Sequence, residues 1–307
     1  MTQFRYQARP KVRVISDNDY AGDPDGLVQL AHLLLTQVAD VRAVVGSHIR
    51  QDVPWPVSKT PSTDAANLAK RVAQYCGYDG PVLVGAEAEM VDANTPAESQ
   101  AVEYLIREAL DDSSGLPLYV LCGGALTTVA SAYLKEPRIA EKITLVTIGG
   151  QGYDEPEDSE PEFNFTADVV ATQVIFNQSN IKIIQVPRST YAKTMCSKIE
   201  LISRMGNVNE LGAFIWSKYE ELDKFAASIM LNFGEVYILG DSPLVMISCF
   251  GSPLGGDESS TSHIRPMFAI NDMGGYDRTK TGREIQVYDN IDNRLMMEDF
   301  FLKVKNL

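Results

Sequence analysis

Four aspartates are crowded into one short segment near the start of the chain. Asp17, Asp19, Asp23 and Asp25 fall within nine residues. Carboxylates held close together repel one another, and a hard cation that prefers oxygen ligands, such as Ca²⁺, relieves that repulsion. The segment is therefore a candidate metal-binding or catalytic site.

The same segment has other interpretations. A turn rich in Asp, Gly and Pro before a capped helix start would account for one or two of the aspartates, but not readily for all of them. An EF-hand loop that begins at Asp17 would need an Asp or Asn at its fifth position and Glu at its twelfth, where the chain has Ala21 and Val28, so this interpretation fails. A phosphohydrolase with Asp17 as nucleophile and Asp19 beside it stays open, although no supporting threonine is near.

The elements around the aspartates predict where they lie. Residues 12–15 form an apolar stretch that predicts a buried strand, and the apolar residues from Leu27 onward predict a helix. The aspartates therefore occupy the turn that follows a strand. In open α/β sheets, ligands bind at that edge of the sheet.

Strand-like and helix-like segments alternate along most of the chain. This rhythm predicts an α/β fold with a mostly parallel central sheet and helices on both of its faces. Strands are expected over residues 41–45, 81–84, 116–121, 143–148 and 181–186, an antiparallel edge pair over 266–270 and 284–288, and helices over 65–75, 97–110, 169–176, 210–233 and 294–304, with one more that ends at Leu134. No repeat or linker interrupts the pattern, so residues 1–307 are expected to form a single domain.

Composition narrows the class of protein. The chain has 307 residues with 41 acidic and 27 basic side chains, which give a net charge of −14. This balance argues against nucleic acid as a partner, because phosphate binding needs clustered Lys and Arg. The N-terminus lacks the apolar core of a secretory signal, and no apolar run is long enough to span a membrane. The cysteines have no close spacing, which predicts free, mostly buried thiols in the cytoplasm.

Several short motifs follow the aspartate-rich turn. They are Val44-Val45-Gly46-Ser47, Gly124-Ala125-Leu126-Thr127-Thr128, Ile148-Gly149-Gly150, Glu162-Phe163-Asn164 with Asp168, Gly240-Asp241-Ser242-Pro243-Leu244, and Thr281-Gly282-Arg283. Their order resembles that of the nucleoside hydrolases of the inosine–uridine type, which cleave the N-glycosidic bond of ribonucleosides. The turn at residues 17–30 is similar to the family's D-T-D-I-G-N-D-x-D-D-A-L-A-L.

The resemblance implies a Ca²⁺ ion at the turn. Asp19 would bind the ion and act as general base on a metal-bound water. The main-chain carbonyl of Thr127 and the carboxylate of Asp241 would complete the metal shell, and Asp25 and Asp23 are further candidates for it.

The resemblance also implies which residues hold the sugar. Asp25, Asn164 and Asp241 would bind the 2′ and 3′ hydroxyls of ribose, and Glu162 would bind the 5′ hydroxyl. This assignment has a physical logic, because cleavage of a glycosidic bond builds positive charge on the sugar ring and carboxylates stabilise that charge.

The chain departs from the family pattern at three positions. Gly26 stands where the family has a metal-binding aspartate, and Asp23 is a candidate to compensate for the lost ligand. Gly240 replaces the histidine that in many members protonates the leaving base. Ser47 replaces an asparagine near the ribose, and His48 beside it is a candidate for substrate contact.

The expected activity is hydrolysis of a ribonucleoside or related N-riboside by a calcium-activated water, in a homo-oligomer. Gly26 and Gly240 favour an alternative, a catalytically silent relative that binds nucleosides or ribose. The phosphohydrolase is the third hypothesis. Arg188 and Tyr191, which follow a later strand, are candidates to contact the base or an acidic group.

Overall fold

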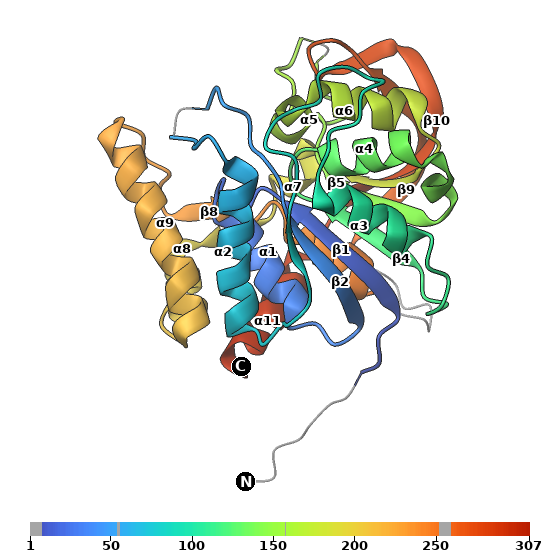
Figure 1. Cartoon of the computed structure of the whole chain (residues 1–307). Coiled ribbons are helices and arrows are strands. Elements are labelled where there is room, and N and C mark those ends of the chain that lie inside the picture. Colours follow the sequence, from blue (N-terminus) through green and yellow to red (C-terminus); the bar gives the residue numbers. More distant parts are fainter. Residues whose placement is uncertain (1–7, 54–55, 157, 252–258) are drawn as a thin grey trace.

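A sheet of eight strands crosses the molecule in the order β3-β2-β1-β4-β5-β6-β10-β9. The computed structural model describes residues 8–53, 56–156, 158–251 and 259–307 (Figure 1). The strands of this sheet are β1 Val12–Asn18, β2 Ala39–Gly46, β3 Val82–Val84, β4 Leu118–Cys122, β5 Ile143–Ile148, β6 Lys182–Val186, β9 Thr261–Ile270 and β10 Tyr276–Asn290. All neighbouring pairs run parallel except β9 with β10, which is antiparallel. The predicted mostly parallel sheet, with its antiparallel edge, is confirmed.

Helices cover both faces of the sheet, as predicted (Figure 1). One hydrophobic cluster joins the sheet to α1, α2, α9, α10 and α11, and a second joins its other face to α3, α4 and α6. The helices are α1 Asp25–Leu34, α2 Pro61–Tyr75, α3 Gln100–Ala109, α4 Thr127–Lys135, α5 Phe163–Ala167, α6 Val169–Gln173, α7 Arg188–Tyr191, α8 Lys198–Leu201, α9 Glu210–Ser228, α10 Pro243–Cys249 and α11 Asn293–Lys305. Pro137–Glu141 forms a 3-10 helix, and Val174–Gln178 and Ile202–Gly206 form π-helical turns.

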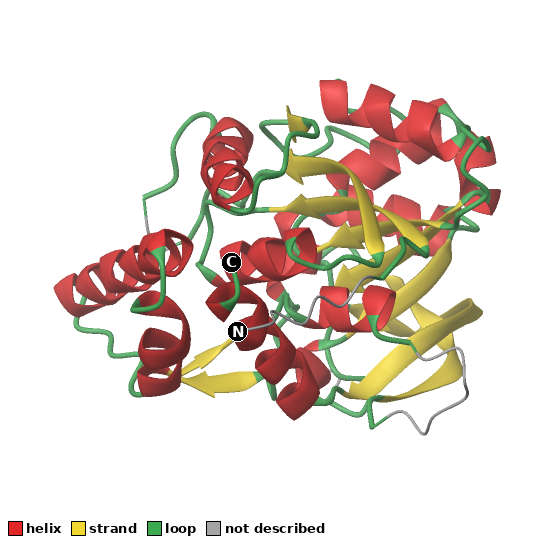
Figure 2. Cartoon of the chain, turned by 90° about the horizontal axis from the view of Figure 1, so that it is seen from below, coloured by secondary structure: helices red, strands yellow, loops and turns green. Residues whose placement is uncertain are grey.

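Two details differ from the sequence expectation. The long helix expected to reach residue 233 ends at Ser228, and Met230 just beyond it has a left-handed backbone with a φ of 60°. A small antiparallel sheet, β7 Met195–Ser197 with β8 Val236–Ile238, was not expected and lies apart from the main sheet (Figure 2). Strands of three residues are too short to show a clear alternation of apolar and polar positions.

The parallel register brings the ends of several strands together. Asp17 near the end of β1 lies beside Val45 of β2 and Cys122 of β4. The chain segments that follow β1, β2, β4 and β5 therefore emerge at one edge of the sheet, where the motifs of the sequence lie. The four cysteines are free, as predicted, and Cys122, Cys196 and Cys249 are buried.

Candidate functional site

A cavity of about 200 Å³ opens at this edge of the sheet. It is lined by Asp19, Asp23, Asp25, Ile49, Gly123, Ile148, Glu162, Phe163, Asn164, Tyr191, Gly240 and Asp241. Five of these residues carry carboxylates. The structure therefore brings most of the predicted site residues together around one pocket, and Ser47, His48 and Thr127 are the predicted residues that do not line it.

The turn between β1 and α1 presents the first aspartates to the cavity. The Asn18 Oδ1 atom accepts a hydrogen bond from the backbone N–H of Asp19 at 2.8 Å, which fixes the start of the turn. A Cβ on Gly124 would lie 3.3 Å from Cγ of Asp19, so glycine allows that loop to approach closely. Asp25 is the first residue of α1. The amino end of a helix favours a negative charge at that position.

Hydrogen bonds join Asp241, which is distant in the sequence, to the same turn. The Asp241 backbone N–H donates to Oδ2 of Asp25 at 3.1 Å, and Oδ2 of Asp241 accepts from Nδ2 of Asn18 at 2.9 Å. Asp23 is held from β8, where the Tyr237 hydroxyl donates to its Oδ2 at 3.0 Å. The acidic group is thus built from two distant parts of the sequence.

Burial and mutual repulsion raise the pKa of several acids in the pocket. Burial raises the pKa of Asp19 well above its ordinary value, and the charges of Asp241 and Asp23 raise it further. Burial also raises the pKa of Asp25, again with help from the charges of Asp23 and Asp241. Burial raises the pKa of Asp241 to about 8. A cation among these groups would favour their charged forms.

The donor atoms suit a hard divalent cation, although they do not form a complete cage. Asp19, Asp25 and Asp241 direct carboxylates to one pocket, and such oxygens are the ligands that Ca²⁺ takes. Within the residues that the structure describes, no three His, Cys, Asp or Glu side chains are arranged to hold a metal ion. A Cβ on Gly26 would lie 3.4 Å from Oδ2 of Asp241, so the carboxylate missing at this position belongs to the same cluster.

Glu162 and Asn164 also line the cavity. Glu162 is buried and precedes α5, and its Oε2 accepts hydrogen bonds from the backbone N–H groups of Gly150 at 3.0 Å and Phe165 at 3.1 Å. Burial raises the pKa of Glu162, whereas the hydrogen bond from Tyr191 lowers it. The Asn164 amide nitrogen donates to two backbone carbonyls, those of Gly123 and Ile148, both at 3.0 Å. Both side chains are thus held in place without a ligand.

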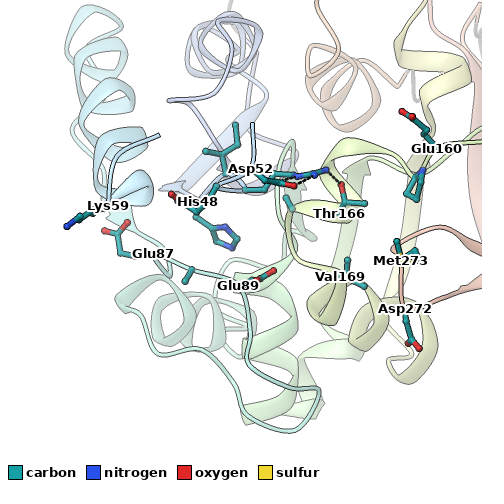
Figure 3. A pocket seen from close by; sticks show the side chains of 16 residues that line it. His48, Asp52, Lys59, Glu87, Glu89, Glu160, Thr166, Val169, Asp272 and Met273 are labelled. Carbon is teal, nitrogen blue, oxygen red and sulfur yellow. Dashed lines mark hydrogen bonds and ion pairs between the residues drawn. The ribbon is translucent and has the colours of Figure 1, made fainter. Parts of the chain in front are cut away.

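His48 is buried and does not line this cavity. Its Nε2 is 2.9 Å from Oγ1 of Thr127, and that hydroxyl donates to Oδ2 of Asp168 at 2.6 Å. Because the Thr127 proton is used on Asp168, Nε2 of His48 must be the donor in its bond. Burial lowers the pKa of His48, which favours this neutral form. Figure 3 shows His48 among the residues that line a second pocket of about 860 Å³.

Ser47 and Asp17 are also buried outside the cavity. They are 2% and 1% exposed, respectively. Burial raises the pKa of Asp17 to about 7, and the hydroxyls of Thr128 and Ser47 lower it in part. A nucleophile must reach its substrate, so the buried position of Asp17 argues against the phosphohydrolase hypothesis.

Tyr191 contributes a contact that the sequence did not specify. Its hydroxyl donates to Oε1 of Glu162 at 2.8 Å, at the end of the short helix α7. Arg188 at the start of the same helix forms an ion pair with Glu155 at 2.7 Å and does not line the cavity. Ile49 and Phe163, whose apolar side chains carried no chemical signal in the sequence, line it instead.

Comparison with known proteins places the chain in a family. A sequence model described as inosine-uridine preferring nucleoside hydrolase matches residues 14–262. The chain belongs to this nucleoside hydrolase family. Its members are N-glycosyl hydrolases, so the protein is an enzyme of that class, as the motifs predicted. No curated protein matches the sequence.

Solved structures support the fold. An inosine-guanosine nucleoside hydrolase has 17% sequence identity and a TM-score of 0.72, with 96% of this chain and 99% of that one covered. A purine-preferring ribonucleoside hydrolase from Gardnerella vaginalis has 15% identity and a TM-score of 0.73, with 96% and 98% covered. The plant nucleoside hydrolase PpNRh1 has 17% identity and a TM-score of 0.68, with 97% and 100% covered.

One further expectation concerns membranes. None of the helices in the described ranges is long and apolar enough to cross a bilayer.

Proposed function

We propose that this nucleoside hydrolase cleaves the N-glycosidic bond of a ribonucleoside or a related N-riboside with water at the Asp19 pocket. The observation that carries the proposal is a cavity of about 200 Å³ lined by five carboxylates at the carboxyl edge of a parallel sheet. Positive charge that develops on the sugar ring in the transition state is stabilised by such groups, which are fixed before the reaction begins.

Each carboxylate has a role in this proposal. Asp19 removes a proton from the attacking water, because its half-buried carboxylate lines the cavity where the substrate and water would meet. Asp25 and Asp241 accept hydrogen bonds from the 2′ and 3′ hydroxyls. Asn164 joins them through its amide oxygen, because its nitrogen already donates to two backbone carbonyls. Glu162 accepts from the 5′ hydroxyl.

We place a Ca²⁺ ion among these acids. Asp19, Asp25 and Asp241 would hold it together with the carbonyl of Thr127, and Asp23 would take the place of the ligand lost at Gly26. When bound, such an ion lowers the pKa of a coordinated water and orients the ribose diol. Asp23 is exposed and already accepts a hydrogen bond from Tyr237, so the site should bind Ca²⁺ weakly.

A silent binding protein is the second candidate, and Gly26 and Gly240 are the observations that favour it. Ribose release from purine and pyrimidine ribonucleosides, measured in Ca²⁺ and in chelator, separates the two. Chelator-sensitive release is expected for the hydrolase. Absence of release from every nucleoside, combined with a rise in melting temperature on addition of nucleoside, would instead identify a binder.

A further inference from the structure

Apart from its acids, the side chains of the pocket that carry N–H or O–H groups already donate hydrogen bonds to the protein. Among the described residues that line it, Asn164 and Tyr191 are the side chains that carry N–H or O–H groups besides the acids. Both amide hydrogens of Asn164 go to backbone carbonyls at 3.0 Å, and the Tyr191 hydroxyl goes to Glu162 at 2.8 Å. Neither side chain has a hydrogen left for a leaving group.

The carboxyl groups of the pocket accept hydrogen bonds from the protein. Glu162 accepts from Tyr191 and from two backbone N–H groups. Asp25 accepts from the backbone of Asp241, and Asp241 accepts from Asn18. Each of these three carboxyl groups is thus held as an acceptor by a neighbouring N–H or O–H group.

The position that would supply an acid has no side chain. A Cβ on Gly240 would lie 3.2 Å from Cδ2 of Tyr191 and 3.3 Å from Oδ2 of Asp25. These neighbours would have to shift by a few tenths of an ångström to admit a side chain at residue 240.

The chain's three histidines lie elsewhere. His32 is buried against Asp299, and His263 on β9 pairs with Asp289. His48 is the nearest in sequence to the pocket wall, but its Nε2 bonds to Thr127 and it does not line the cavity. No histidine of this chain faces the pocket as the structure describes it.

We infer that the preferred substrates are N-ribosides whose base carries a positive charge, such as an N7-alkylated purine or a pyridinium riboside. The inference rests on the proposed function and names its substrate class. In such a substrate, the C1′–N bond breaks and its electron pair neutralises the charge on the base, which leaves without a proton. The oxygen of water bonds to C1′, and one of its protons goes to Asp19 and then to solvent. The acidic pocket, in a chain of net charge −14, also attracts a cation.

The first test compares 7-methylguanosine with guanosine, and nicotinamide riboside with inosine and uridine. Ribose release is measured for the wild-type protein, with spontaneous hydrolysis subtracted. We expect kcat/KM for the cationic substrates to exceed that for the neutral ones by about 100-fold or more, the usual worth of a general acid. Neutral nucleosides that turn over within tenfold of the cationic ones overturn the inference but leave the proposed function intact. Release from none of the five contradicts both.

The second test separates the missing acid from the intrinsic reactivity of charged substrates. Gly240→His adds a proton donor, and Gly240→Ala adds only a Cβ; thermal unfolding checks that both variants fold. The histidine variant is expected to raise guanosine turnover at least tenfold without raising that of 7-methylguanosine, and the alanine variant is not expected to do so. Equal effects of the two substitutions would count against the inference. If the histidine variant fails to fold, the substrate comparison decides alone.

Discussion

Asn18 explains why Gly26 and the metal site are linked. A Cβ added to Gly26 would lie 3.1 Å from Nδ2 of Asn18, and a Cβ added to Gly123 would lie 2.5 Å from the same atom. The same Nδ2 donates to Asp241 at 2.9 Å. A neutral donor therefore faces Asp241 from the side where the family pattern has a carboxylate ligand. The absence of a side chain at Gly26 and the amide of Asn18 therefore both bear on the carboxylate of Asp241.

Restoring the carboxylate should tighten cation binding. Gly26→Asp combined with Asn18→Thr supplies the ligand and removes the amide that would crowd it. We expect Ca²⁺ affinity, measured by calorimetry, to rise at least tenfold, because affinity follows the charge of the ligand set. Gly26→Asn with Asn18→Thr is the neutral control. A carboxylate variant that binds Ca²⁺ no better than this control would contradict the assignment of the metal site.

Tyr191 should act on substrate binding through Glu162. Tyr191→Phe keeps the ring and removes the hydrogen bond of 2.8 Å. The loss of one hydrogen bond to a charged group, about 1.5–3 kcal/mol, should raise KM by about tenfold or more with little change in kcat. The effect should vanish with a 5′-deoxynucleoside, which lacks the hydroxyl assigned to Glu162. An equal effect on both substrates would show that Tyr191 serves only the fold.

At the scale of elements, α1 links the site to the end of the chain. Its first residue is Asp25, and near its last turn His32 is completely buried and its Nε2 lies 2.8 Å from Oδ2 of Asp299 in α11. Lys303 pairs with the same carboxylate at 2.5 Å. The direction of α1, and with it the position of Asp25, is therefore set partly by α11.

This contact should make stability depend on pH. Burial lowers the pKa of His32 below its ordinary 6.5, so the unfolded chain binds a proton more readily than the folded protein. Stability from the buried neutral ring is therefore present above pH 6.5 and is lost as the pH falls below it. His32→Asn should lower the melting temperature most at pH 7.5 and least at pH 5. A difference that does not vary with pH would contradict this account.

Periodicity predicted most of the elements because the parallel strands are short, apolar and bounded by Gly or Pro. β5 has the predicted bounds, and β3 begins one residue later than predicted. It was harder to predict which side chains next to a strand end line the cavity, because successive side chains point in opposite directions. Ile49 lines the cavity, whereas its neighbour His48 faces Thr127. The Tyr191–Glu162 and Asn18–Asp241 contacts depend on tertiary packing, which a single sequence does not reveal.

At the scale of the whole molecule, one corner exposes apolar side chains next to the site. Met195, Ile199, Met230, Val236 and Ile238 are 40–96% exposed. Tyr237, between two of them, holds Asp23. The homo-oligomer stays a prediction, and this corner is where we expect it to form. Val236→Lys should then reduce the mass measured by light scattering, whereas Leu302→Lys, a control at an exposed position on α11, should not. A wild-type monomer would contradict the prediction.

The central claim is that Asp19 drives hydrolysis of an N-riboside. The most direct test measures the release of free base and ribose by the wild-type protein and by Asp19→Asn, with thermal unfolding to confirm that both are folded. We predict equimolar base and ribose from the wild type and a loss of about 100-fold or more in the variant, as expected when a general base is removed. Unchanged turnover in a folded Asp19→Asn protein would contradict the account.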